Sequence, residues 1–280
     1  MDGYKAQPMP KIRLDIELLN RNLAPTRERA RALIMEGVVF VDGQKVTKAG
    51  EGVAPDAAIE VRAAGLLYVS RGGLKLEKAL REFSIELNGK VCADVGASTG
   101  GFTDCMLQNG AAAVYAIDVG YGQLDYRLRT DERVHVVERT NARYMESAWF
   151  ASALNFASID VSFISLRLML PPLHSCLQEG GEVVALIKPQ FEAGRAEVGK
   201  NGVVRDAMVH ESVCIEILNF AYSIGYAARG LSFSPVKGPK GNIEFLAHFR
   251  KPCAKNAPTA LDLSILSKNI VQSAHIFHKS

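Results

Sequence analysis

The sequence lacks three features that would place it in a broad class of protein. No apolar run approaches the ~20 residues that cross a bilayer, and there is no signal-peptide core, so we expect a cytoplasmic protein. The five cysteines show no paired spacing, which argues against a disulfide framework and a zinc site. The net charge is only +3, and residues 1–63 carry ten Lys or Arg against nine Asp or Glu. Any surface for nucleic acid must therefore be a local patch.

The remaining composition is that of a soluble globular chain with room for a large and a small domain. Its 280 residues are 48% hydrophobic and 22% charged. Changes in pattern divide it into a flexible N-terminus (1–10), a small domain (11–63), a linker (64–69), a large domain (70–250) and a tail (251–280). A short amphipathic helix is predicted in the tail from Leu263, Leu266 and Ile270.

The small domain begins with two predicted helices. The first covers 11–22, on the helical spacing of Ile12, Ile16 and Leu19. The second starts after Thr26, its predicted N-cap, and ends before Gly37. Arginines lie on the outer side of this second helix, where charge alone would predict a solvated face.

A hairpin follows the helices, with Asp42-Gly43 as its two-residue turn and 59–61 as a closing strand. This order of elements resembles the αL RNA-binding domain of a ribosomal protein, of tyrosyl-tRNA synthetases and of pseudouridine synthases. The most specific parts are EGVV (36–39) and DGQKV (42–46). The resemblance implies that basic residues contact RNA, and we expect those contacts at Arg13, Arg27, Arg29, Arg31 and Lys45.

The large domain is organised around residues 91–104, where an apolar strand leads through Asp94 into a glycine-rich turn and a helix start. Gly96, Gly100 and Gly101 let the backbone approach a ligand with no Cβ in the way. A helix that starts near Phe102 would aim free N–H groups at that ligand. Such a turn at the carboxyl end of a strand is typical of a nucleotide-type cofactor site.

Three interpretations compete for this turn, besides a βα turn that binds nothing. The dinucleotide fingerprint needs a glycine at its third position, where Ser98 stands. GASTG (96–100) also matches the esterase nucleophile elbow, but too little chain precedes it for the strands that such an elbow follows. S-adenosylmethionine (SAM) fits best, because Asp94, two residues before the first glycine, offers a carboxylate to the methionine ammonium.

Strands and helices alternate through the rest of the large domain, which predicts a doubly wound, mostly parallel sheet in an α/β fold. The predicted strands are 91–95, 113–117, 134–137, 156–160, 182–187, 226–232 and 243–249, with a helix over 207–223. Asp118, 22 residues after Gly96, stands where a ribose-binding acid is expected, although it also fits a surface acid. We further expect Ala97 and Ser98 in the cofactor turn and Glu138 and Asn141 near the adenine; Phe102 packs beneath the turn or is simply a core aromatic.

Four charged residues stand out near the ends of these elements. Asp160 and Lys188 each come at the end of a predicted strand, Glu244 lies in the last strand, and Lys75 lies on the helix before the cofactor turn, outside its apolar stripe. The carboxyl ends of parallel strands meet at one edge of a sheet, where this architecture binds ligands. Taken singly, Asp160 and Lys188 are equally well explained as edge charges with salt-bridge partners.

Five stretches together resemble the TlyA family: YVSRGGLKL (68–76), DVGASTGGFTD (94–104), DVSFISL (160–166), IKPQFE (187–192) and GPKGNIEF (238–245). That family comprises SAM-dependent ribosomal RNA 2′-O-methyltransferases with an N-terminal αL domain and an FtsJ-like, Rossmann-like catalytic domain with a seven-stranded sheet. The resemblance covers about 11–250 and implies a Lys-Asp-Lys-Glu tetrad at Lys75, Asp160, Lys188 and Glu244. The substrate class that it implies is cytidine ribose in ribosomal RNA, within ribosomal subunits.

The chemistry of a ribose hydroxyl agrees with such a tetrad. A 2′-hydroxyl is a poor nucleophile and must lose its proton as the methyl group arrives, and a lysine can take that proton only when it is neutral. We predict Lys188 as the base, Lys75 as the neighbouring cation, and Asp160 and Glu244 as acids that orient the lysines. In-line methyl transfer then depends chiefly on positioning, and we expect no metal.

Basic residues outside the small domain are further candidates for RNA phosphates, which position RNA without reading its sequence. They are Arg71, Arg195, Lys200 and Lys240, and the segment 192–205 is expected to form a mobile loop beside Lys188. One departure from the family concerns the linker. Members often carry an Arg-x-aromatic-x element there, and Arg62-Ala63-Ala64-Gly65 lacks the aromatic residue.

Other functions remain compatible with parts of the sequence. A non-catalytic RNA-binding or ribosome assembly factor would retain the fold, and some family members are named haemolysins, which suggests a membrane-lysing protein. Neither a spanning segment nor a strongly amphipathic basic helix supports lysis. A pseudouridine synthase would share the small domain but would not need the glycine-rich turn.

Overall fold

The computed structural model describes residues 11–24, 26–61, 67–253 and 263–279. The chain divides into two compact units, Met1–Leu66 and Leu67–Ser280, which are considered one at a time. The N-terminal residues 1–10, the stretch 62–65 that departs from the family and the first half of the predicted linker, 64–66, lie outside the described residues.

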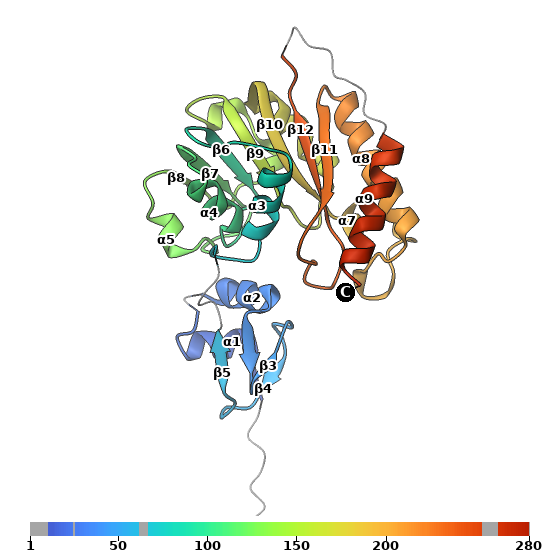
Figure 1. The fold of residues 1–280 in the computed structure, drawn as a ribbon. Helices are drawn as coiled ribbons and strands as arrows, with labels where there is room; N and C mark the ends of the chain where they lie inside the picture. Colours follow the sequence, from blue (N-terminus) through green and yellow to red (C-terminus); the bar gives the residue numbers. More distant parts are fainter. Residues whose placement is uncertain (1–10, 25, 62–66, 254–262, 280) are drawn as a thin grey trace, which may run out of the picture. The chain divides into compact units, whose positions relative to one another are not determined.

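The first unit packs two helices against short antiparallel strands (Figure 1). The central strand pairs with the hairpin strand on one side and the closing strand on the other, in the order β3-β2-β5. A separate pair joins β1 and β4. The elements are β1 (Ile12–Arg13), α1 (Leu14–Asn20), α2 (Arg27–Glu36), β2 (Val39–Val41), β3 (Gln44–Lys45), β4 (Gly52–Val53) and β5 (Ile59–Val61).

The predicted signals for α2 and the hairpin are confirmed. The Thr26 side chain accepts a hydrogen bond from the Arg29 N–H at 3.1 Å, as an N-cap does. Gly37 ends the helix at φ 69°, and Asp42 and Gly43 at φ 48° and 75° form the two-residue turn.

The predicted bounds of the first helix, 11–22, are wrong. Residues 12 and 13 pair with β4 as a strand, so the helix begins only at Leu14. Leu14 and Leu18 are fully buried, whereas Leu19 is 39% exposed. The spacing of apolar residues did not identify the buried side of the helix, because a charged residue, Asp15, is also fully buried.

The second unit is a seven-stranded sheet in the order β11-β12-β10-β9-β6-β7-β8. The five strands from β10 to β8 are parallel, and β12 runs antiparallel to both β10 and β11. The strands are β6 (Val91–Val95), β7 (Ala113–Ile117), β8 (Val134–Val137), β9 (Leu154–Ile159), β10 (Leu177–Ile187), β11 (Ala227–Phe233) and β12 (Phe245–Arg250).

Helices cover both faces of this sheet, which confirms the predicted doubly wound fold (Figure 1). One buried cluster joins the sheet to α3, α4 and α5, and a second joins the opposite face to α6, α8 and α9. The helices are α3 (Gly73–Glu82), α4 (Gly101–Gln108), α5 (Tyr126–Arg129), α6 (Leu170–Cys176), α7 (Pro189–Glu192), α8 (Ala207–Ser223) and α9 (Leu263–Phe277). Short 3₁₀ turns are η1 (Ala142–Tyr144), η2 (Ser147–Trp149), η3 (Leu166–Leu168) and η4 (Lys200–Gly202).

The helix predicted in the tail is α9, which lies along α8 and β11. Its Leu266 and Ile270 pack against the core as partly buried residues. Among the described residues, we find no helix with both the length and the apolar character required to cross a membrane.

The strand order of the sheet reverses between β6 and β9. These strands are neighbours, but the chain leaves β6 toward β7 and leaves β9 toward β10, so the strand order reverses at this point. A crevice opens at the carboxyl ends of the strands at such a reversal. Gly96 follows β6 directly and Asp160 follows β9 directly, so the two predicted site segments meet there.

Candidate active site

The four predicted tetrad residues come together in one cluster. Lys188 Nζ lies 2.6 Å from Asp160 Oδ1, and Lys75 Nζ lies 3.6 Å from Asp160 Oδ2. On its other side, Lys75 Nζ donates to Glu244 Oε2 at 2.7 Å. Asp160 therefore bridges two lysines, and the order of contacts is Lys188–Asp160–Lys75–Glu244.

Each member of the cluster comes from a different element around the crevice. Asp160 and Lys188 directly follow the parallel strands β9 and β10, as predicted. Lys75 lies in the first turn of α3, which packs over the face of the sheet that these strands share. Glu244 comes just before β12 rather than inside it, and its carbonyl accepts a hydrogen bond from the Ser234 N–H at 2.8 Å.

Burial and charge together determine the ionisation of this cluster. Burial lowers the pKa of Lys75, but the carboxylates of Asp160 and Glu244 outweigh it, so the net pKa is raised. Burial raises the pKa of Asp160, but attraction to Lys188 and Lys75 brings it down to about 2. Asp160 is thus a carboxylate, and Lys75 an ammonium, at neutral pH.

The interpretation of Lys75 as lying outside the apolar stripe needs a correction. Lys75 and its neighbour Lys78 are each only 9% exposed. Lys75 is buried because two carboxylates compensate its charge, and Lys78 because its Nζ donates to the Phe233 carbonyl at 2.8 Å above the Phe233 ring.

Neighbouring atoms leave no room for a Cβ at the glycines of the turn after β6. A Cβ on Gly96 would lie 2.5 Å from the Asp160 carbonyl oxygen, and its φ of 88° disfavours other residues. A Cβ on Gly101 would meet Ser70 Oγ at 2.3 Å. Gly100, at φ 93°, is the residue before α4. The turn therefore lies against the tetrad's loop on one side and the start of α3 on the other.

Asp94 holds this turn in place from beneath. Its Oδ2 accepts hydrogen bonds from both the backbone N–H and the hydroxyl of Thr103, and its Oδ1 accepts from the Ser158 hydroxyl at 3.0 Å. Burial raises the pKa of Asp94 to about 6, against these hydrogen bonds. Asp94 is 0% exposed, and these contacts support the start of α4. Its contact with a ligand ammonium stays a prediction.

Asp118 borders the turn from the end of β7, as the spacing predicted. Its two carboxylate oxygens accept hydrogen bonds from the Ser98 and Gly120 N–H groups at 2.8 and 2.7 Å. Ala97 is buried, and Ser98 takes a positive φ of 48° so that its N–H meets Asp118. Phe102 is 3% exposed and belongs to the core under the turn.

The two residues predicted near an adenine follow β8. Glu138 accepts a hydrogen bond from the Gly122 N–H at 2.9 Å and pairs with Arg129. Asn141 is exposed, and its side chain caps η1 through the Arg143 N–H. Val119, which the sequence did not single out, is 69% exposed next to Asp118.

Three residues beside the tetrad were also missed. Ser162 Oγ accepts a hydrogen bond from Lys188 Nζ at 3.0 Å. Phe163 is 86% exposed and adopts φ 63°, a left-handed conformation that is rare for a bulky residue. Its ring centroid lies 4.9 Å from that of Phe191, which in turn lies 6.0 Å from Lys188 Nζ. The signal was in the stretch DVSFISL, but nothing in a sequence shows that an aromatic side chain faces solvent.

Glu192 joins the loop after Asp160 to the segment after Lys188. Its carboxylate accepts hydrogen bonds from the Ser165 hydroxyl at 2.6 Å and the Leu166 N–H at 2.8 Å. Burial raises the pKa of Glu192, and these two hydrogen bonds partly offset that effect. The carboxylate thus fixes the spacing between the two segments that carry Asp160 and Lys188.

We expect Glu192→Ala to lower the rate of the reaction at this site by ~10- to 100-fold, because a shift of about 1 Å between reacting groups is this costly. Cofactor affinity should change little, since Glu192 lies away from the glycine turn. Glu192→Gln, which keeps the shape and one acceptor, should restore part of the rate. Glu197→Ala, at an exposed acid of the same segment, is the control. An equal effect of both alanine variants would contradict this role.

The predicted phosphate contacts of the second unit come from three segments, before α3, after α7 and before β12. Arg195, Lys200 and Lys240 are exposed, and Arg71 is half-buried before α3. A Cβ on Gly202 would lie 3.5 Å from Lys240 Nζ, so the Lys200 and Lys240 loops are neighbours. The Asn242 side chain links the two loops, because it accepts a hydrogen bond from the Val204 N–H and donates one to the Gly202 carbonyl.

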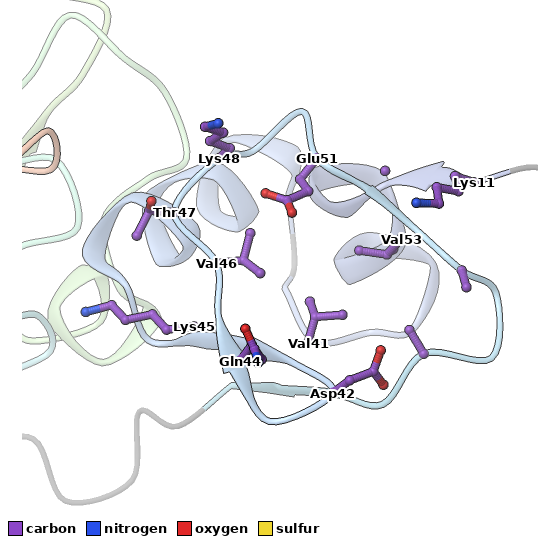
Figure 2. Close-up of a pocket in the computed structure, with 13 residues that line it drawn as sticks. Lys11, Val41, Asp42, Gln44, Lys45, Val46, Thr47, Lys48, Glu51 and Val53 are labelled. Atoms are coloured by element: carbon purple, nitrogen blue, oxygen red, sulfur yellow. The ribbon is translucent and has the colours of Figure 1, made fainter. Parts of the chain in front are cut away.

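In the first unit, a depression of about 370 Å³ lies beside the hairpin (Figure 2). Val41, Val46 and Val53 face its interior, and Lys11, Lys45 and Lys48 stand around its rim with Asp42 and Glu51. Lys45, a predicted RNA contact, is exposed there and lies over Gly37. This depression contains none of the tetrad residues.

The predicted arginines of the first unit surround a buried acid. Arg13, Arg27 and Arg31 each donate to Asp15 through their side chains, whereas Arg29 donates its backbone N–H to the Thr26 hydroxyl that caps α2. In the parts of the chain that the structure describes, no group of three or more His, Cys, Asp or Glu side chains is placed to hold a metal ion.

Comparison with protein-family models matches residues 68–251 to the FtsJ-like methyltransferases and residues 12–59 to the S4 domain. The chain is 54% identical over 243 residues to "Putative rRNA methyltransferase YqxC" of Bacillus subtilis, which covers 86% of each chain. It is 39% identical over 266 residues to "16S/23S rRNA (cytidine-2′-O)-methyltransferase TlyA" of Mycobacterium tuberculosis, which covers 95% of this chain and 96% of that one.

A solved structure shows the same fold. It is titled "Putative hemolysin from Streptococcus thermophilus", with a TM-score of 0.76 and 47% sequence identity. The match covers 97% of this chain and 98% of that chain.

Proposed function

Because the chain belongs to the TlyA family of FtsJ-like methyltransferases, we propose that it transfers a methyl group from SAM to the 2′-hydroxyl of a cytidine in ribosomal RNA. The observation that carries this proposal is the cluster Lys188–Asp160–Lys75–Glu244, at the crevice where the glycine turn ends. The S4 domain match supports RNA as the substrate. Ribosomal subunits are the proposed partners, and the cytoplasm the proposed location.

The residues around the crevice fit SAM. Gly96 leaves no side chain between the turn and Asp160, and α4 begins directly after the turn, so the positive end of its helix dipole lies beside it. Asp118 stands at the end of β7, where a carboxylate accepts hydrogen bonds from ribose hydroxyls. Bound there, SAM supplies an electrophilic methyl group on a positively charged sulfur.

Lys188 is the better candidate for the base. Lys75 lies between two carboxylates, which hold its proton, whereas Lys188 pairs with one carboxylate and a neutral hydroxyl. In this proposal Lys188 Nζ would take the 2′-hydroxyl proton as the bond from the ribose oxygen to the methyl carbon forms. The bond from that carbon to sulfur would break at the same time, and the neutral thioether S-adenosylhomocysteine would leave. A cationic sulfur nearby favours the neutral form of Lys188. Asp160 orients the Nζ atoms of both lysines, and Glu244 compensates the charge of Lys75.

Phe163 supplies the surface for the target base. An aromatic ring that is 86% exposed at the edge of an RNA-modifying site is suited to stacking on an unpaired base. Because Phe163 lies three residues after Asp160, a stacked nucleotide would place its ribose near Lys188. Arg195, Lys200 and Lys240 would hold the flanking phosphates.

The direct test is methyl transfer from isotope-labelled SAM to purified 30S and 50S subunits, followed by mass spectrometry of the digested RNA. The expected product is 2′-O-methylcytidine. Binding of subunits without any label transfer would contradict the proposal and identify the protein as a non-catalytic RNA-binding factor. Label on a base instead of a ribose would also overturn it.

A further inference from the structure

Asp15 of α1 is a fully buried carboxylate that gathers three arginines from two elements. Arg13, the residue before α1, donates through Nε and Nη2 to both carboxylate oxygens at 2.9 and 3.0 Å. Arg27 and Arg31, one turn apart on α2, each donate through Nε to Asp15 Oδ2 at 3.0 Å. One acid thus fixes three guanidinium groups at a single point.

The arginines are not hidden by these contacts. Their side chains remain 47%, 41% and 46% exposed, in the order Arg13, Arg27 and Arg31, whereas that of Asp15 is 0% exposed. The Arg13 guanidinium, with help from Arg31 and Arg27, holds the pKa of Asp15 far below its usual range against the opposing effect of burial. The group therefore carries three positive charges and one negative charge, with only the positive charges accessible.

This arrangement removes an entropic cost that RNA binding would otherwise include. A free arginine side chain has many rotamers, and binding must freeze it in one of them. Here each Nε is already bonded, so the remaining N–H donors project from fixed positions. Charged donors in a fixed fork match the oxygens of phosphate groups.

We propose that Asp15 is a positioning residue that assembles Arg13, Arg27 and Arg31 into a preformed site for adjacent phosphates of an RNA backbone. The inference rests on the proposed function only in taking RNA as the ligand. The proposal predicts a change in RNA affinity opposite to the one that net charge alone would predict. Removal of a negative charge should strengthen RNA binding by simple electrostatics, but removal of Asp15 should weaken it.

The test measures RNA binding by the full-length chain, with no methyl transfer involved. A fluorescein-labelled hairpin RNA of mixed sequence is a suitable probe, because phosphate contacts do not read sequence. Asp15→Asn should raise the dissociation constant by roughly tenfold, the cost of ordering three rotamer-rich side chains on binding. Glu28→Gln is the matched control, because Glu28 is an exposed acid on α2 and its removal changes the net charge equally.

Glu28→Gln should bind the hairpin as tightly as the wild type or more tightly. If Asp15→Asn binds as tightly as Glu28→Gln, the proposal is overturned, whatever the enzyme methylates. Far-UV circular dichroism establishes that the variant is folded. Should it unfold, the NMR signals of the wild-type arginine Nε–H groups decide: three protected signals at neutral pH support the site, and rapid exchange at these groups refutes it.

Discussion

Replacement of Lys188 by alanine is expected to reduce methyl transfer by about 10³-fold or more, the scale of a lost general base in a positioned site. SAM affinity should stay within about twofold, because the lysine is a base here and not an anchor for the cofactor. The loss arises because no other neutral amine is available: Lys75 is held as an ammonium between Asp160 and Glu244. Single-turnover transfer to ribosomal subunits, with calorimetric titration of SAM, measures both quantities.

Two further variants make this expectation specific. Lys188→Arg keeps a positive charge next to Asp160 but cannot serve as a base at neutral pH, so it should be nearly as inactive as the alanine variant. Lys90→Ala is the control for loss of a lysine, because Lys90 forms its ion pair with Glu182 rather than with the tetrad. Unchanged transfer by Lys188→Ala would remove Lys188 from the mechanism.

The pH dependence of the transfer rate offers a second check on Lys188 as the base. The pKa of Asp160 is depressed to about 2, so this carboxylate is ionised throughout the range in which ribosomal subunits are intact. Its contribution to stability is present above its unfolded pKa near 4 and is lost only as pH falls through about 2. A rise of the transfer rate between pH 6 and 9 would therefore report a base other than Asp160, and the rise should vanish in Lys188→Arg.

The parts of the site that depend on strand topology could be predicted from the sequence. Asp160 and Lys188 follow apolar strands, and parallel strands must bring their carboxyl ends to one edge, so their proximity could be predicted. The N-cap at Thr26 and the turn at Asp42-Gly43 were also predictable, because both depend on local backbone chemistry. The positions of Gly96 and Asp118 follow from the spacing of one βα unit.

Features that depend on contacts between distant segments could not be predicted. Asp15 appears in the sequence as one of nine acids that balance ten bases, and only the fold shows that it is buried while its arginines are exposed. The burial of Lys75 could not be predicted from its own helix, because the carboxylates that compensate its charge lie 85 and 169 residues away in the sequence. The acid-glycine spacing around Asp94 predicted a ligand contact, but it did not show that the carboxylate also holds the start of α4.

Phe163 combines a left-handed backbone conformation with a largely exposed aromatic ring. A left-handed backbone conformation costs a bulky residue about 1–3 kcal/mol, and a ring that is 86% exposed regains little of this by burial. Strain of this kind persists at functional sites when a ligand makes use of the side chain. Phe163→Ala and Phe163→Gly should therefore both lose activity, by about 5- to 150-fold, which is the range for loss of one base–aromatic stack.

The two variants should differ in stability and not in activity. Glycine adopts a positive φ without a steric penalty, so Phe163→Gly should be more stable than Phe163→Ala by about 1 kcal/mol in thermal or urea unfolding. Phe163→Trp keeps a stacking surface and should retain most of the rate, and Leu168→Ala, at a 47% exposed residue of the same loop region, controls for loss of an exposed apolar group. Full activity in Phe163→Gly would show that the ring does not hold the target base. A glycine variant less stable than the alanine variant would show that the strain is compensated within the protein itself.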